Sequence, residues 1–321
     1  MVLNRMGFQR KASLALVWLA LWAALAQSVA WAGSGQDGPR GFVWEATRGA
    51  QRVILVGTVH VGRADFVGLP AAIERRAQQA AVIVVEADVS NAQAAAEATQ
   101  RYALYGPGEA ALDERLSADL WRRLKALLPR YGMNPAVVGR MKPWFVAMNL
   151  TLAELARLGL SPAQGTERYL FALAAQTGKP VVEMEGMLAQ LKLLDSALPS
   201  EQAAFLEQAI SAIEQNETQR EAQTIMQAWA QADAPAMERL LAKLRARAQT
   251  NAADRFMFDQ VLEGRNPGML RAIERYGASG RLHLVAVGSL HYFGPNGIVD
   301  GLRKRGWTVT QVAHQSPRAP R

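Results

Sequence analysis

The sequence predicts an α/β fold with a mixed central sheet built from both chain ends and a large helical insertion between them. Apolar, β-branched runs typical of strands lie near both ends, at residues 51–56 and 282–287. A further apolar run at 82–85 follows a helical stretch at 70–80, which is the order of a βαβ unit. Residues 90–280 are mostly helical in pattern. The chain ends therefore supply most of the strands.

The first elements of the sheet can be assigned in order. Residues 41–47 and 51–56 flank the turn-like Arg48-Gly49-Ala50 and predict a hairpin. The run at 82–85 is expected to lie parallel to the second strand of this hairpin. On that prediction, Glu86 at the end of the run lies next to the strand that delivers His60.

The middle of the chain is helical with one interruption. Gly178 and Pro180 bracket the start of a strand at 179–184. Residues 199–247 read as three amphipathic helices, and the whole insertion, about 199–262, is expected to be a scaffold or a lid. A helix at 299–305 and a strand at 307–312 then complete a second strand-helix-strand unit.

Residues 1–32 are typical of a signal peptide. A basic start precedes an apolar run at 13–26, and Ala30-Trp31-Ala32 supplies the small residues that cleavage requires. The alternative is an uncleaved anchor, because residues 13–32 are almost long enough to span a membrane. Both alternatives place the α/β body, 33–315, outside the cytoplasm, in the periplasm or secreted.

Composition narrows the chemistry. The 321 residues include no cysteine, which excludes disulfides, thiolate nucleophiles and cysteine zinc sites, so any metal needs His and carboxylate ligands. Removing residues 1–32 takes away three of 36 basic residues against 28 acidic ones, so the net charge falls from +8 to +5. This mild excess is spread along helices and predicts no nucleic-acid binding. The Pro- and Arg-rich tail at 316–321 is expected to be disordered.

Two strands end in the same local pattern. Gly57-Thr58-Val59-His60 and Gly288-Ser289-Leu290-His291 each follow an apolar run. Glycine lets the backbone turn sharply after a strand, and ligands gather at the carboxyl ends of parallel strands. His60 and His291 are therefore expected to converge. His283 inside the last strand unit fits a buried structural residue, and His314 lies in the tail.

Glu86 adds a carboxylate to the two histidines. Two imidazoles and a carboxylate, with one position left for water, are what a catalytic divalent ion needs. The same groups could work without metal, as acid and base, with Glu86 setting the imidazole tautomer. Glu86 could also form only a strand-end salt bridge.

The ordered set of motifs resembles the TraB/GumN family, which includes the Tiki metalloproteases. The resemblance covers residues 42–313 and rests on the two Gly-x-x-His motifs together with Glu86, Lys142-Pro143-Trp144, Gly165-x-Glu167, Gly178-Lys179-Pro180-Val181, Glu185, Gln190, Arg265-Asn266 and Gly294. It implies a metal-dependent hydrolase, peptidase-like in the Tiki branch, that depends on His60, His291 and an acidic residue matched by Glu86.

Three further residues match family positions. Glu167 stands where the family has Asp, one methylene shorter. Glu185 and Arg265 could orient a substrate carboxylate or a ligand histidine, or could be a structural ion pair. The expected function is hydrolysis of a peptide or other amide or ester substrate. The alternatives are a metal-free esterase-like hydrolase and a non-enzymatic periplasmic binder of metal or haem.

The leader gives the first testable prediction. If residues 1–32 are removed on export, the mature chain starts at Gly33 or within a few residues of it, because cleavage follows the Ala-x-Ala pattern. N-terminal sequencing of the exported protein measures this directly. A chain that begins at Met1 in the membrane fraction would contradict the prediction and support the anchor.

Overall fold

The computed structural model describes residues 40–63, 66 and 68–312. A six-stranded sheet has the order β6-β4-β7-β2-β1-β8. Its strands are β1 (Phe42–Arg48), β2 (Gln51–Thr58), β4 (Val82–Val85), β6 (Val181–Glu183), β7 (His283–Gly288) and β8 (Thr308–Gln311). A separate pair joins β3 (Gly62–Arg63) to β5 (Leu160–Ser161). The predicted mixed sheet from both chain ends is confirmed, with one edge strand, β6, from the middle of the chain.

Strand direction brings four carboxyl ends together. β2, β7, β4 and β6 pair in parallel, whereas β1 runs antiparallel to β2 and to β8, so the predicted hairpin is confirmed. In the register of β2 with β7, Thr58 lies opposite Gly288. The two Gly-x-x-His turns therefore leave the sheet side by side.

The predicted neighbour of β2 is wrong. β4 does not pair with β2, because β7 from the other end of the chain lies between them and pairs with both. The crossover through α1 (Ala71–Gln79) spans two strand positions, and β7 fills the gap. Glu86, which follows β4, consequently lies beside the end of β7 and not beside the strand that delivers His60.

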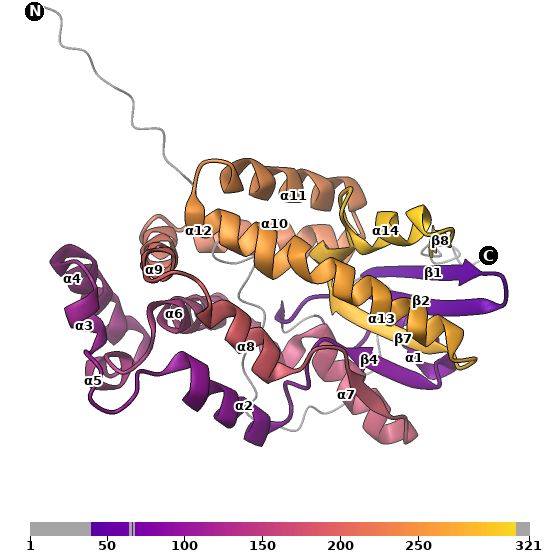
Figure 1. The fold of residues 1–321 in the computed structure, drawn as a ribbon, viewed down its shortest axis with the longest axis horizontal. Coiled ribbons are helices and arrows are strands. Elements are labelled where there is room, and N and C mark those ends of the chain that lie inside the picture. The colour runs from indigo at the N-terminus through magenta and orange to yellow at the C-terminus, as the bar shows by residue number, and fades with distance from the viewer. Residues whose placement is uncertain (1–39, 64–65, 67, 313–321) are drawn as a thin grey trace, which may run out of the picture.

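Helices cover the sheet and form a lobe away from it. In Figure 1, α13 crosses the strands, while α3 to α6 and α9 gather at the other end of the molecule. The remaining α-helices are α2 (Ala92–Ala98), α3 (Leu112–Arg115), α4 (Ala118–Leu127), α5 (Pro135–Val138), α6 (Pro143–Arg157), α7 (Thr166–Thr177), α8 (Met187–Asp195), α9 (Pro199–Glu214), α10 (Glu217–Gln231), α11 (Ala234–Ala248), α12 (Ala252–Arg255), α13 (Asn266–Ala278) and α14 (Ile298–Lys304). α9, α10 and α11 fall where three amphipathic helices are expected.

The apolar core follows this division. One cluster of buried side chains joins the sheet to helices on both its faces, including α1, α7, α10 and α13. A second cluster lies between α4, α6 and α9, and a third lies between α6, α8 and the segment after α12. The helical lobe therefore has its own interior and also continues into the sheet core through α10.

The segment between α12 and α13 is irregular and positions two polar side chains. A π-helix at Phe256–Leu262 continues α12, and a 3₁₀ turn at Glu263–Arg265 leads into α13. Such wide turns inside helices are frequent at functional sites, because they turn side chains away from the regular helical spacing. Here they place Arg265 and Asn266 beside the carboxyl end of β7.

No helix in the described ranges 40–63, 66 and 68–312 is long and apolar enough to cross a membrane. The predicted leader, 1–32, and the predicted tail, 316–321, lie outside the described residues.

The close approach of β2 to the turn after β7 gives a prediction for stability. A Cβ at Gly57 would lie 2.9 Å from Ser289 Oγ and 3.1 Å from Phe42 Cβ, inside the buried core. We expect Gly57→Ala to lower the free energy of unfolding by about 1–3 kcal/mol, as overpacking does. Urea unfolding measures it. Gly268→Ala in α13 is the control, since its Cβ would meet only Arg271 Nη2 at 3.9 Å; an equal loss in both variants would contradict the packing argument.

Candidate functional site

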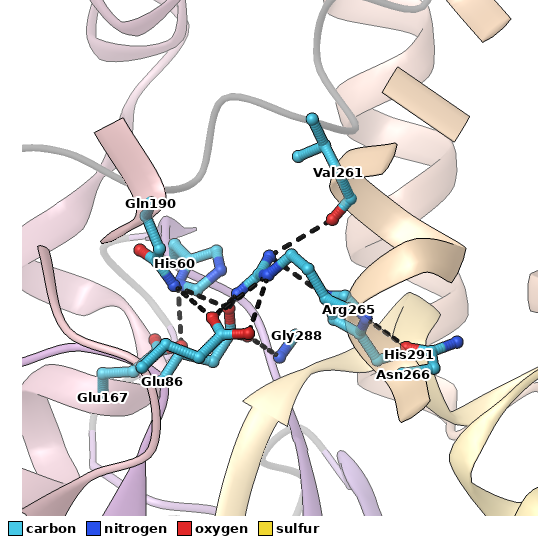
Figure 2. A network of polar contacts seen from close by, with 10 residues as sticks. His60, Glu86, Glu167, Gln190, Val261, Arg265, Asn266, Gly288 and His291 are labelled. Carbon is cyan, nitrogen blue, oxygen red and sulfur yellow. Dashed lines mark hydrogen bonds and ion pairs between the residues drawn. The ribbon is translucent and has the colours of Figure 1, made fainter. Parts of the chain in front are cut away.

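The described site lies at the carboxyl ends of β2, β4 and β7, around Gly288. A Cβ on Gly288 would lie 3.4 Å from Glu86 Oε1, 3.6 Å from His60 Nε2 and 3.6 Å from His291 Cδ2. Three polar side chains therefore converge beside Gly288. Figure 2 shows these side chains and the network around them. The predicted convergence of the two histidines is present in the structure.

His60 is oriented by a carboxylate from α7. Its Nδ1 lies 2.7 Å from Glu167 Oε1. The backbones are joined as well, since Thr166 N donates to Val59 O at 2.9 Å and a Cβ on Gly165 would lie 2.4 Å from His60 O. Because a carboxylate accepts hydrogen bonds, the proton of His60 sits on Nδ1 and Nε2 keeps its lone pair. The Gly-x-Glu motif therefore fixes both the position and the tautomer of His60.

His291 is oriented in the same manner by an amide from α13. Its Nδ1 lies 2.7 Å from Asn266 Oδ1, and Asn266 Nδ2 donates to Asn296 O at 2.8 Å. Because Asn266 uses its NH₂ group to donate to Asn296 O, its Oδ1 faces His291, and Nδ1 of His291 is the donor of that hydrogen bond. Nε2 is left as an acceptor, and Arg265 Nη1 approaches it at 3.4 Å. Both imidazoles therefore use Nδ1 for support and Nε2 for the site.

Arg265 pairs with two carboxylates, Glu86 after β4 and Glu185 after β6, and Glu86 also accepts from the end of β7. Its Nη2 donates to Glu86 Oε2 and Glu185 Oε2, and its Nε donates to Glu185 at 3.1 Å. Gln190 Nε2 bridges the same two carboxylates at 3.2 and 3.1 Å. Gly288 N donates to Glu86 Oε1 at 2.6 Å. Glu86, Glu185 and Arg265 thus form a largely buried ion cluster, in which Figure 2 shows Arg265 between Glu86 and His291.

The cluster sets the protonation of the site. Burial by itself would raise the pKa of Glu86, but Arg265 holds that pKa well below its usual 4.5. Burial also lowers the pKa of His60, yet the carboxylates of Glu167 and Glu86 together outweigh it, and the net pKa lies above 6.5. Burial and the charge of Arg265 lower the pKa of His291 to about 3. Near neutral pH, His291 is therefore neutral, whereas the pKa of His60 is shifted in the opposite direction.

The donor set can be tested against the divalent ion that the sequence predicts. His60 Nε2 and Glu86 Oε1 lie beside Gly288, but the His291 atom nearest to that glycine is Cδ2, and Nε2 of His291 lies 3.4 Å from the cation Arg265. Glu86 already accepts from Arg265, Gln190 and Gly288. In the part of the chain that the structure describes, no three His, Asp or Glu side chains form a group that could hold a metal. In this arrangement the residues do not fit a three-ligand divalent site.

All the candidate residues of the sequence analysis lie in or next to this network. Glu167 contacts His60, and Glu185 and Arg265 contact each other and Glu86. Gly57 contributes its carbonyl, which accepts from Trp229 Nε1 of α10 at 2.9 Å. His283 is buried, with Nδ1 2.9 Å from Arg281 O, as expected for a structural histidine. His314 lies outside the described residues.

Three residues contact this network or its turns without a role that the sequence predicts: Asn266, Gln190 and Trp229. Asn266 and Gln190 belong to the motifs of the family resemblance, but nothing in their spacing says what they touch. Trp229 lies in the helical insertion, 172 positions from its partner Gly57. Such contacts carry no local signal, because they depend on how distant elements pack.

The pair of His60 with Glu167 gives a prediction for titration. Glu167→Gln removes the charge that contributes most to raising the pKa of His60, so that pKa falls. Imidazole NMR across pH measures it, with the His60 resonance assigned from the spectrum of His60→Gln. As a control, Glu97→Gln on the exposed face of α2 leaves the pKa of His60 unchanged. An unchanged pKa in Glu167→Gln would mean that the two side chains do not interact in solution.

Comparison with known proteins gives the same placement over nearly the whole described chain. The TraB/PrgY/gumN family matches residues 42–311. The uncharacterized protein YbaP of Escherichia coli K12 is 29% identical over 252 residues, which cover 78% of this chain and 87% of YbaP. YbaP of Shigella flexneri matches with the same identity and coverage. No solved structure matches significantly. The chain belongs to the TraB/PrgY/gumN family.

Proposed function

We propose that this protein is an exported hydrolase that cleaves an amide or ester bond with water activated by His60. One observation carries the proposal. His60 is held by Glu167 at 2.7 Å through Nδ1, and its Nε2 and Glu86 Oε1 both lie beside Gly288, 3.6 and 3.4 Å from the position of a Cβ on that glycine. Both of these atoms accept hydrogen bonds, so a water bound between them would donate to each and direct its lone pair away from them.

The first chemical step follows from this geometry. The water oxygen attacks the carbonyl carbon of the substrate as His60 Nε2 takes one of its protons. Glu167 stabilises the imidazolium that forms, because it accepts from Nδ1 and carries the opposite charge. Glu86 holds the second proton of the water and stays ionised, since Arg265 keeps its pKa low.

The second step returns the proton. The tetrahedral intermediate expels its amine or alcohol as His60 donates the proton to the leaving atom, so the imidazole ends neutral. Arg265, the cation that contacts Glu86 and His291, lowers the energy of the negative oxygen that develops on the substrate. His291 is neutral at working pH and does not serve as the acid. It supports the site through Asn266 and Arg265 instead.

A second candidate keeps the divalent ion. Both imidazoles bind an oxygen through Nδ1, and metal-ligating histidines have this support. An ion would need His291 to turn Nε2 toward His60 and Glu86 to give up its contact with Arg265. The ion stays a prediction, and it would polarise the carbonyl and lower the pKa of water. A peptide substrate is proposed from the resemblance to the Tiki metalloproteases.

Turnover by the purified full chain tests the proposal. We expect cleavage within a peptide library, or of p-nitrophenyl esters, to continue in chelator. We expect His60→Gln to lose about a hundredfold or more, as removal of a positioned base does. Because only the neutral imidazole accepts a proton, kcat/KM rises with pH through the pKa of His60, above 6.5. His283→Gln, a buried histidine outside the network, keeps its activity as the control.

Elemental analysis separates the two candidates. If an ion is shared, metal is present at stoichiometric amounts, chelator stops turnover, and His60→Ala and His291→Ala each abolish binding with no further loss in the double variant. If His60 works without metal, metal content and activity are unrelated. Absence of cleavage with and without added divalent ions, across both substrate sets, would reject a hydrolase of either kind.

A further inference from the structure

Glu221 in α10 is a buried carboxylate without a hydrogen bond. Neither of its oxygens is accessible to solvent, and neither has a hydrogen-bond partner. The nearest cation, Lys243 Nζ of α11, lies 3.9 Å from Oε1, too far for a hydrogen bond, and the Lys243 side chain is 52% exposed. An ionised carboxylate with so little compensation destabilises the folded state, because burying a charge costs much more free energy than burying a protonated, neutral carboxyl group.

The residues around Glu221 do not provide a cation that pairs closely with its carboxylate. The charged groups that act on it are Lys243 and Arg247 from α11 and Glu217 and Arg220 from α10. Arg247 forms a two-pronged pair with Asp254, and Arg220 lies 3.7 Å from Glu217. Arg247 and Arg220 are therefore each paired with a carboxylate other than that of Glu221.

α10 connects this carboxylate to the proposed site. Two turns beyond Glu221, Trp229 is buried and its Nε1 donates to Gly57 O at 2.9 Å. Gly57 begins the turn that ends at His60. A shift of α10 against α11 therefore moves or breaks the contact through which the helical insertion holds this turn.

We propose that Glu221 makes the packing of α10 against α11 sensitive to pH and that Trp229 transmits this change to the Gly57–His60 turn. Below neutral pH the carboxyl is protonated and the helices pack closely. Above it, the ionised carboxylate draws solvent or Lys243 inward, and the helices separate. This device is independent of which reaction the site performs.

The sign of the pH dependence follows from linkage. Burial raises the pKa of Glu221 from 4.5 to about 7, with Lys243 and Arg247 opposing the shift. Because the folded pKa lies above that of the unfolded chain, the stabilisation is complete below about 4.5 and is lost as pH rises to about 7. Removal of the carboxylate should therefore have its effect at the alkaline end.

Thermal unfolding of the full chain between pH 4.5 and 8 tests whether Glu221 makes the packing of α10 against α11 sensitive to pH. Glu221→Met and Glu221→Gln both remove the charge, and Met adds no buried polar group. We expect the Tm of each variant to match the wild type near pH 4.5 and to exceed it by several degrees at pH 8. Glu97→Gln, at an exposed position of α2, shows no such change. A constant difference across pH, or no difference in the Met variant, would overturn the proposal.

Amide hydrogen exchange tests the transmission. After correction for intrinsic rates, protection of α10, α11 and residues 56–62 falls in the wild type from pH 5.5 to 8 and stays constant in Glu221→Met. Trp229→Phe replaces the indole with a phenyl ring, which stays apolar and aromatic but has no N–H, so α10 and α11 still respond while residues 56–62 do not. If residues 56–62 respond equally in Trp229→Phe, Trp229 does not carry the change.

Discussion

The buried pairing of Arg265 with Glu86 and Glu185 is the interaction on which the site depends. One guanidinium connects the ends of β4 and β6 to the segment before α13, and Gly288 adds the end of β7 through its N–H. Removing one partner of a buried ion pair costs about 3–5 kcal/mol, because the other charge is left without compensation. Two carboxylates around one cation are tolerable here because Gln190 donates to both. The cluster therefore fixes the carboxyl ends of β4, β6 and β7 relative to one another.

The histidines depend on this cluster in different ways. Arg265 places positive charge beside His291, which lowers its pKa to about 3 and keeps it neutral. His60 is governed by Glu167 instead, and its pKa rises above 6.5. Two residues with the same local motif thus acquire opposite electrostatic surroundings. Opposite pKa shifts in neighbouring titratable groups are what different chemical roles require, and they support the proposal that His60 transfers protons while His291 is structural.

Much of the fold was readable from the sequence, because strands and amphipathic helices carry their own periodicity. The hairpin of β1 and β2, the parallel run at β4 and the three helices α9 to α11 were predicted from patterns a few residues long. The predicted pairing of β4 with β2 was wrong, since an α/β crossover can leave room for another strand. β7 occupies that room, and its identity as the neighbour of both strands depends on a contact between residues more than 190 positions apart.

The sequence by itself determined which side chains stand at strand ends: glycine three residues before His60 and before His291 marks two sharp turns, and Glu86 directly follows an apolar run. Only the tertiary structure decided what those side chains do. It placed Arg265, 179 positions from Glu86, against that carboxylate, and it placed Nε2 of His291 3.4 Å from Nη1 of the same arginine. The physical reason is that hydrogen bonding and charge act over a few ångströms in space, and chain separation says nothing about which distant groups packing brings within that range.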